Sequence, residues 1–183
     1  MKTIYTLIFL SIVSIVLSYS IGAFYAYFYP MKYQDDIVSF SAQYGVDAGI
    51  IASVANVESG FDENVISDKG AIGVMQLMPS TAQWLAEKLV EDYSEDLLFN
   101  GQYNLKLGSF YLSYLFTQFE VPQTALCAYN AGPGKVKEWL KDSQLSSDGK
   151  TLSRIPYQET KNYLDRVMKS YRYYKIKYKN LVK

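Results

Sequence analysis

The first thirty residues of the chain are almost entirely apolar. Residues 3–31 contain no charged side chain, and an α-helix of that length would span about 43 Å, more than a hydrocarbon core of roughly 30 Å. Aromatic residues follow the apolar centre, as they do at a membrane–water interface. These residues are Phe24, Tyr25, Tyr27, Phe28 and Tyr29. The pattern predicts one transmembrane anchor over residues 1–31.

A cleaved signal peptide is the alternative interpretation of the same segment. The triplet Ser18-Tyr19-Ser20 has small residues at the spacing of a cleavage site. A cleaved peptide has no need of an aromatic belt, however, so the anchor is preferred. Lys2 and the amino terminus favour a cytoplasmic N-terminus. Under either interpretation residues 32–183 are exported, and the anchor makes the chain a single-pass membrane protein with one extracytoplasmic domain.

Residues 32–183 repeat apolar positions at helical spacing and predict a compact, mainly α domain. Gly60, Gly70 and Gly73 interrupt the pattern, so residues 60–76 are expected to be a loop or irregular strand. The acidic cluster from Glu91 to Asp96 is expected to be a solvated loop, and residues 132–134 (Gly-Pro-Gly) a turn. The expected helices are one over Ile37–Tyr44 that stops at Gly45, one capped by Asp47 that runs through Glu58, and others over about 79–89, 104–119, 122–131 and 157–178.

The amino-acid composition excludes several kinds of catalytic and metal-binding site. Lys plus Arg and Asp plus Glu each number 18, so no global charge points to a nucleic-acid partner. The chain has no histidine, which excludes histidine-based acid/base catalysis and most zinc sites. Its one cysteine, Cys127, lies among apolar residues and is expected to be a small buried hydrophobe. We therefore expect no metal and no cofactor, with chemistry from carboxylates, hydroxyls, amides or tyrosines.

Glu58 is the carboxylate with the most unusual predicted environment. It shares a helical stripe with Ile51, Val54 and Ala55, so it should point toward the apolar side of its helix. Burial and the partial negative charge of a helix C-terminus both raise a carboxyl pKa above about 4.3, as a general acid requires. Periodicity alone leaves an alternative open, in which Glu58 ends the helix with its side chain in water.

Four ordered motifs extend from Glu58 to the last predicted helix. Together they resemble the lytic transglycosylase domain of the goose-lysozyme-like superfamily, also known as the SLT domain. The resemblance covers roughly residues 34–178, including an Asn-x-x-x-Gly helix at Asn104 and Gly108. The motifs are Glu58-Ser59; Ser67, Gly70-Ala71, Gly73, Met75-Gln76, Met78-Pro79 and Thr81-Ala82; Ala128 to Gly134; and Ile155 to Thr160 followed by Tyr163.

The resemblance implies a lysozyme-like fold, in the α+β lysozyme superfamily, and cleavage of peptidoglycan glycan strands. Glu58 would be the one catalytic carboxylate, acting first as acid and then as base. It would protonate the oxygen between N-acetylmuramic acid and N-acetylglucosamine and then take the proton of the muramoyl C6 hydroxyl. The product is a 1,6-anhydromuramoyl end. Asp62, Glu63 and Asp68 are the local candidates for a second carboxylate, but the resemblance gives none of them a catalytic role.

The same resemblance implies substrate-binding roles for further residues. Ser67 and Tyr163 would lie near Glu58, and Glu159 belongs to the last motif. Some aromatic residues could stack on sugar rings. The remaining predicted saccharide contacts are Met75, Gln76, Met78, Thr81, Tyr129 and Asn130, although core packing explains Met75 and Met78 equally well.

Two other functions stay open. A hydrolytic muramidase on the same scaffold would differ only in using water as the nucleophile. A catalytically silent, membrane-tethered wall-binding protein is the other, and retention of Glu58 with all four motifs argues against it. The expected partners are the peptidoglycan strands and the membrane, without nucleic acid; the sequence identifies no protein partner.

Overall fold

The structure is a computed structural model and describes residues 2–179. By internal contacts the chain divides into two compact units, Met1–Lys32 and Tyr33–Lys183. The first unit consists of one helix, and the second carries every predicted site residue.

The first unit is the apolar helix α1 (Lys2–Phe28). Its apolar side chains are exposed along its whole length, and none of the span is buried. Within the described residues it is the one helix long and apolar enough to cross a membrane, over Thr3–Phe28, or about 39 Å. A signal sequence at the same place would meet the same criteria. The predicted helix is confirmed.

The second unit is built from helices, and the mainly α prediction is confirmed. In the described part of this unit the only β structure is two isolated antiparallel bridges, Ile66–Ile72 and Ile72–Leu77. The predicted loop or irregular strand lies where these bridges form. The helices are α2 (Gln34–Tyr44), α3 (Ala48–Ser59), α4 (Pro79–Leu89), the 3₁₀ helix η1 (Glu95–Phe99), α5 (Gly101–Gln118), α6 (Pro122–Ala131), α7 (Pro133–Lys141) and α8 (Gln158–Tyr178).

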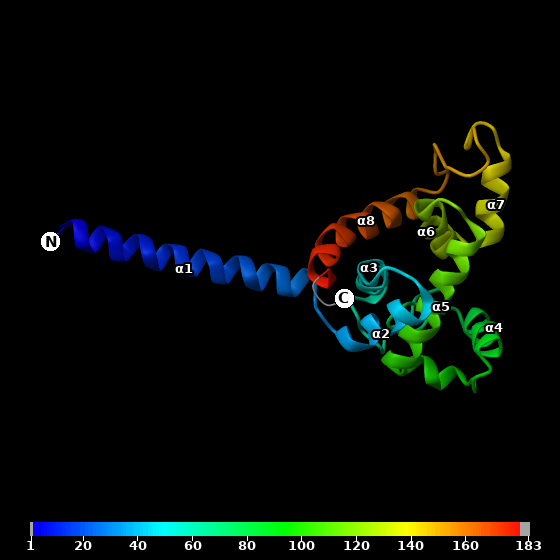
Figure 1. Cartoon of the computed structure of the whole chain (residues 1–183), viewed down its shortest axis with the longest axis horizontal. Coiled ribbons are helices and arrows are strands. Elements are labelled where there is room, and N and C mark those ends of the chain that lie inside the picture. Colours follow the sequence, from blue (N-terminus) through cyan, green and yellow to red (C-terminus); the bar gives the residue numbers. More distant parts are fainter. Residues whose placement is uncertain (1, 180–183) are drawn as a thin grey trace. The chain divides into compact units, whose positions relative to one another are not determined.

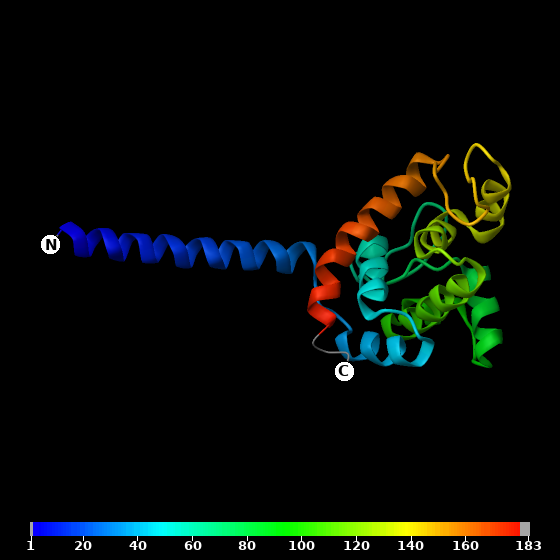
Figure 2. The same cartoon turned by 45° about the horizontal axis from the view of Figure 1, so that its top comes forward.

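Helix α3 lies in the interior of this unit. Its residues from Ala48 to Ala55 are all buried, and α8 runs alongside it in both views (Figures 1 and 2). Asp47 caps the helix as predicted, because its carboxylate accepts a hydrogen bond from the Gly49 amide at 2.7 Å. Gly49 also permits the close approach of α8, since a Cβ there would lie 2.9 Å from the Lys175 backbone nitrogen.

One local prediction was wrong in part and another was wrong. Asp92, Glu95 and Asp96 are exposed, as predicted for the acidic cluster. Glu91, however, is partly buried and ion-paired with Lys106, and Glu95–Phe99 forms η1 because Leu98 is buried in the core. The Gly-Pro-Gly turn is the start of a helix. Gly132, with φ 87°, makes the corner, and Pro133 is the first residue of α7. Helix α7 forms because Val136 and Trp139 bury one of its faces.

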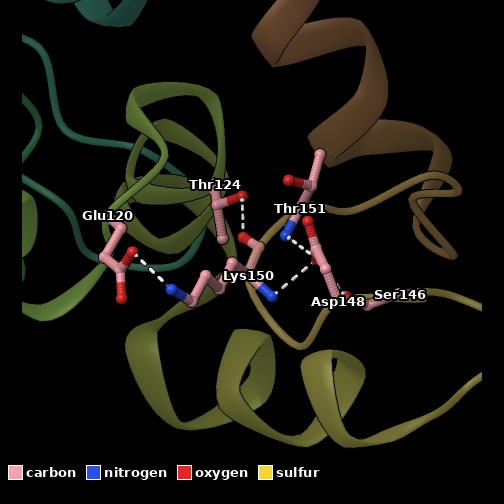
Figure 3. A network of polar contacts seen from close by, with 6 residues as sticks. All are labelled: Glu120, Thr124, Ser146, Asp148, Lys150 and Thr151. Carbon is pink, nitrogen blue, oxygen red and sulfur yellow. Dashed lines mark hydrogen bonds and ion pairs between the residues drawn. The ribbon is translucent and has the colours of Figure 1, made fainter.

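The segment between α7 and α8 is held by a small network of polar contacts (Figure 3). The Asp148 carboxylate accepts hydrogen bonds from the backbone amides of Lys150 and Thr151, at 2.8 and 2.7 Å. These bonds hold the Asp148 pKa well below its usual range. Lys150 reaches Glu120, and its carbonyl accepts a hydrogen bond from Thr124. The network fastens the segment that leads into α8 to the start of α6.

The loop between α3 and α4 is fastened by Asn104 of α5. The Asn104 side chain is fully buried. Its amide donates to the carbonyls of Ile72 and Leu98, at 2.8 and 3.0 Å, and its oxygen accepts from the Met75 amide at 2.8 Å. Gly73, with φ 78°, lies against this amide, where a Cβ would overlap both Asn104 and the Leu98 carbonyl. The loop conformation therefore depends on a buried side chain from a distant helix.

We expect Asn104→Ala to lower the free energy of unfolding by about 3 kcal/mol, because it leaves buried backbone groups without partners. The measurement is urea unfolding of the whole chain in detergent micelles, followed by circular dichroism. Ser109→Ala on the same helix is the matched control, since the Ser109 hydroxyl is buried and has no hydrogen-bond partner. Equal stability of the two variants would contradict the role given to Asn104.

Candidate active site

Glu58 lies in the last turn of α3, next to the residue that ends the helix. Gly60 takes a left-handed conformation, with φ 64°, and its amide bonds back to the helix. The Ser59 hydroxyl donates to the Val74 carbonyl at 2.8 Å and accepts from the Asp62 amide at 3.1 Å. Ser59 is thus a helix-end hydrogen-bonding residue, and it ties the helix to the loop that covers it.

The Glu58 side chain lines a pocket with a volume of about 320 Å³. The pocket brings together residues from α3, the α3–α4 loop, α6 and the start of α8, although these segments are up to about a hundred residues apart in sequence. Of the ten predicted site residues, the pocket lining includes Glu58, Ser67, Gln76, Met78, Tyr129, Asn130 and Glu159.

The pKa of Glu58 is raised from 4.5 to about 7, as predicted in direction. Burial is the largest cause, because it penalises the charged form. The Tyr163 hydroxyl and the Arg166 guanidinium lower the pKa, whereas the Glu159 carboxylate raises it. The carboxyl group is therefore poised to hold or release a proton near neutral pH.

Two tyrosines adjoin this carboxyl group. Tyr163 is 1% exposed, and its hydroxyl interacts with the Glu58 carboxyl, although this contact is not a well-formed hydrogen bond. The Tyr129 hydroxyl donates to the Met75 carbonyl at 2.8 Å. Burial and then the charge of Glu58 raise the pKa of both phenols well above the usual value. Both hydroxyls therefore keep their protons at neutral pH.

Several polar lining residues also build the pocket wall. The Gln76 amide nitrogen donates to the carbonyls of Val65 and Gly73, both at 3.0 Å. The Ser67 hydroxyl accepts from the Ala71 amide. The Asn130 side-chain oxygen accepts from the Thr160 hydroxyl at 2.8 Å, which links α6 to α8. These contacts fix the side chains before any ligand enters.

Two predicted saccharide contacts lie elsewhere. Met75 is fully buried, and it packs so closely on Gly108 that a Cβ there would overlap its sulfur. Its position is that of the core-packing alternative, and the neighbouring Gln76 lines the pocket instead. Thr81 lines a second pocket, together with Trp84 and Tyr114.

Three lining residues and one charge near Glu58 were not among the predicted site residues. Asp68, Lys69 and Ala71 line the pocket, and Arg166 acts on Glu58 from α8. The Lys69 ammonium pairs with the Glu159 carboxylate at 3.2 Å, and both side chains are largely exposed. No local signal could have found this pair, because its members are 90 residues apart. Helical spacing could have placed Arg166 near Tyr163, three residues earlier.

The candidates for a second carboxylate differ in their contacts. The Glu63 carboxylate accepts from the Tyr33 hydroxyl and the Gly101 amide, at 2.9 and 3.2 Å, so it holds the loop to α5. Asp62 accepts from the Asn64 amide within the loop. Asp68 is exposed at the pocket edge. None of these three contacts resembles the buried position of the Glu58 carboxyl, whose pKa burial raises.

Comparison with known proteins gives consistent matches. Residues 37–151 match the family described as the transglycosylase SLT domain. The soluble lytic murein transglycosylase of Salmonella typhimurium is 32% identical over 80% of this chain and 23% of its own length. The membrane-bound lytic murein transglycosylase C of Glaesserella parasuis is 26% identical over 79% of this chain and 46% of its own length.

A solved lytic transglycosylase structure is also similar to this chain. The lytic transglycosylase Slt from Pseudomonas aeruginosa, solved as an inactive glutamate-to-glutamine mutant, superposes with a TM-score of 0.72. It is 32% identical over 81% of this chain and 25% of its own length. The chain therefore spans about a quarter of the length of the Salmonella typhimurium and Pseudomonas aeruginosa relatives. The lysozyme-like fold prediction is confirmed.

We expect Glu58→Gln to stabilise the fold at alkaline pH. The pKa of Glu58 is about 7 in the fold, above its ordinary value of 4.5. Keeping this carboxyl protonated therefore costs the folded state progressively more free energy as the pH rises between the two values. Glutamine carries no charge. The free energy of unfolding of the variant should therefore exceed that of the wild type by on the order of 1–3 kcal/mol at about pH 8, and the two values should differ little near pH 4.5.

The measurement is urea unfolding of both whole chains in detergent at the two pH values. Glu138→Gln is the matched control, because Glu138 is exposed and paired with Lys135, which lowers its pKa. A wild type as stable as Glu58→Gln at the alkaline pH would show that the Glu58 carboxyl is not desolvated.

Proposed function

Because this chain belongs to the transglycosylase SLT family, we propose that it is a lytic transglycosylase that cleaves peptidoglycan glycan strands. The observation that carries the proposal is Glu58, a carboxyl group that lines a pocket and has a pKa of about 7. The Pseudomonas aeruginosa relative supports it, since a single glutamate-to-glutamine mutant of that enzyme is inactive.

In the first step Glu58 acts as a general acid. It transfers its proton to the glycosidic oxygen between N-acetylmuramic acid and N-acetylglucosamine, and the bond from C1 to that oxygen breaks. The leaving sugar takes the proton as a hydroxyl group. The carbonyl oxygen of the muramoyl N-acetyl group bonds to C1 and stabilises the developing positive charge, so no protein nucleophile is needed.

In the second step the Glu58 carboxylate acts as a general base. It takes the proton of the muramoyl C6 hydroxyl, and the C6 oxygen bonds to C1 while the N-acetyl oxygen leaves. The product is a 1,6-anhydromuramoyl end, and no water is consumed. The attacking hydroxyl belongs to the same sugar, so it benefits from a high effective concentration. A pKa near 7 suits both steps, since one group must give and then regain a proton.

We assign supporting roles to the residues around Glu58. Burial raises the pKa of Glu58, and Tyr163 and Arg166 lower it, so these two residues stabilise the carboxylate formed in the first step. Ser67, Gln76, Tyr129 and Asn130 line the pocket with donors and acceptors for the sugars, and Met78 offers an exposed apolar surface. Glu159 lines the pocket edge with its partner Lys69.

We further propose that α1 anchors the chain and that residues 32–183 act as one extracytoplasmic domain. The fully exposed apolar surface of α1 supports an anchor, because a helix of a water-soluble fold buries one stripe. The similarity to a membrane-bound transglycosylase fits as well. Mass spectrometry of the chain from the membrane fraction tests this, since loss of the N-terminal segment would make it a signal peptide.

We expect Glu58→Gln to keep the fold and to lower the rate on purified peptidoglycan by at least ~100-fold, the scale of a general acid contribution. The products are analysed as muropeptides by mass spectrometry, with Glu138→Gln as the matched control. Wild-type activity in Glu58→Gln would exclude the assignment. Reducing ends in place of anhydro ends in the wild-type digest would make the protein a hydrolytic muramidase.

We expect the alkaline limb of the wild-type kcat/KM profile to lie near pH 7, where Glu58 loses its proton. Arg166→Gln removes a charge that lowers the Glu58 pKa, so its alkaline limb should move to higher pH. Arg172→Gln, further along α8, should leave the profile in place. If the alkaline limbs of Arg166→Gln and the wild type lie at the same pH, Arg166 does not lower the pKa of Glu58.

A further inference from the structure

The end of α8 combines positive charge with an exposed apolar side chain. From residue 166 to the last residue, the sequence has seven basic residues and no acidic one. Lys175, Lys177 and Lys179 are exposed, and Ile176, between the first two, is 71% exposed. These four residues form a surface that we call the basic end of α8. Positive charge around an apolar side chain is typical of a surface that lies on a lipid bilayer.

No carboxylate neutralises the charge of the basic end. None of the ion pairs among residues 2–179 includes Lys175, Lys177 or Lys179. The Lys175 ammonium lies 5.5 Å from the ring centroid of Tyr171, and the Lys177 ammonium lies 5.5 Å from that of Tyr173. A ring face attracts an ammonium group but leaves its net charge in place. The positive charge therefore remains available to an anionic partner.

The basic end lies on the side of the second unit where that unit begins. The ring centroids of Tyr33 and Phe61 are 6.5 Å apart, and those of Phe61 and Tyr174 are 6.3 Å apart. Tyr174 in turn lies 6.2 Å from Tyr178, next to the basic end. Both views show the last turn of α8 and the start of α2 on the same side of this unit (Figures 1 and 2).

The chain enters this unit through a short and fixed junction. The Tyr33 hydroxyl donates to the Glu63 carboxylate at 2.9 Å, which holds Tyr33 to the unit. Only residues 29–32 separate α1 from Tyr33, so chain length alone keeps Tyr33 within about 18 Å of the end of α1. With α1 as the anchor, the side of the unit that carries the basic end therefore stays close to the bilayer surface.

Three acidic residues lie on the same side but on other elements. Asp35 and Asp36 belong to the first turn of α2, where the helix dipole stabilises their charge. Asp47 lines a pocket with Lys175 and Lys179, so a phosphate inside that pocket would be repelled by the Asp47 carboxylate. The lysines are therefore suited to an anionic surface outside the pocket rather than to an anion within it.

We propose that the basic end of α8 binds the anionic phospholipid headgroups of the membrane that holds α1; this rests on the proposed anchor and not on the reaction at Glu58. Each lysine near an anionic bilayer adds to the attraction, and its long stem lets the ammonium stay among the headgroups while Ile176 enters the layer below them. The helix dipole favours cations at any helix C-terminus, but it gives no reason for an exposed isoleucine between two of them.

This contact orients the catalytic unit on the membrane. Glu159, at the start of α8, lines the Glu58 pocket. Ile176 lies near the other end of the same helix, about 26 Å away along its axis. The edge of the pocket and the lipid-bound end are thus separated by most of the length of α8. The pocket stays open to glycan strands while the end of the helix is bound to lipid.

The test places a polarity-sensitive dye on Ile176→Cys in the whole chain, reconstituted into vesicles. The chain has one cysteine of its own, Cys127, and it is 1% exposed, so the introduced thiol is the exposed one. The vesicles contain phosphatidylcholine alone or an equal mixture with phosphatidylglycerol, and some lipids carry a nitroxide quencher close to the headgroup. We expect quenching of the dye in the phosphatidylglycerol vesicles alone, and loss of that quenching at high salt.

We expect the triple variant Lys175→Gln/Lys177→Gln/Lys179→Gln to lower the ratio of quenched to unquenched chains by at least roughly 10-fold. The physical reason is that each lysine at an anionic surface contributes about 5-fold. Substitution of the same three lysines by arginine keeps the charge and should keep the quenching. Circular dichroism of each variant checks that the fold is retained.

Two controls separate the basic end from charge and position in general. The variant Lys135→Gln/Lys137→Gln/Lys141→Gln removes the same charge from α7 and should leave the quenching unchanged. Ser147→Cys, labelled with the same dye, is exposed in the segment between α7 and α8. That segment adjoins the opposite end of α8, so its dye should be quenched in neither kind of vesicle.

The outcomes are distinct. Equal quenching in both kinds of vesicle, or quenching that survives in the triple glutamine variant of α8, overturns the proposal, because the anchor alone would then bring the dye to the bilayer. Binding of soluble polyphosphate without lipid-dependent quenching also overturns it, since the partner would be an anionic polymer. Charge-dependent quenching, together with loss of the N-terminal segment in cells, supports the lipid-binding surface and overturns the anchor.

Discussion

The arrangement of the candidate site depends on three hydrogen bonds from one buried amide. Asn104 binds the backbone of Ile72, Met75 and Leu98, and so fixes a loop whose glycines would otherwise allow many conformations. The loop is bonded to the end of α3 through the Ser59–Val74 hydrogen bond, places Gln76 in the pocket lining and places Met75 in the core. The raised pKa of Glu58 is therefore a consequence of packing at a site that Asn104 holds together.

Glu58 owes its pKa of about 7 to opposing effects rather than to burial alone. Desolvation favours the neutral acid, while Tyr163 and Arg166, both on α8, favour the carboxylate. Helix α8 packs along α3, so the groups that moderate the acid are carried by the helix that also encloses it. The Lys69–Glu159 pair lies at the exposed edge of the same pocket, where solvent screens its charges.

Much of the fold could be predicted because its signals are local. Helix α4 begins and ends where its proline and apolar spacing predicted, Asp47 caps α3, and Cys127 is a buried hydrophobe whose pKa burial raises to about 11. The failures were at α7 and η1. Both are short helices that form because Trp139 and Leu98 find buried positions against other elements, and a nine-residue or five-residue pattern is too short to indicate that.

The sequence by itself determined the apolar first helix, the helical nature of the rest, and Glu58 with its motifs, since helix periodicity and short motifs involve residues close together in the chain. Tertiary structure decided which of these residues meet. It paired Lys69 with Glu159, set Arg166 near Glu58, removed Met75 from the pocket and grouped Thr81 with Trp84 and Tyr114. These contacts join distant segments, and their geometry depends on how α3, α5 and α8 pack, which no local pattern encodes.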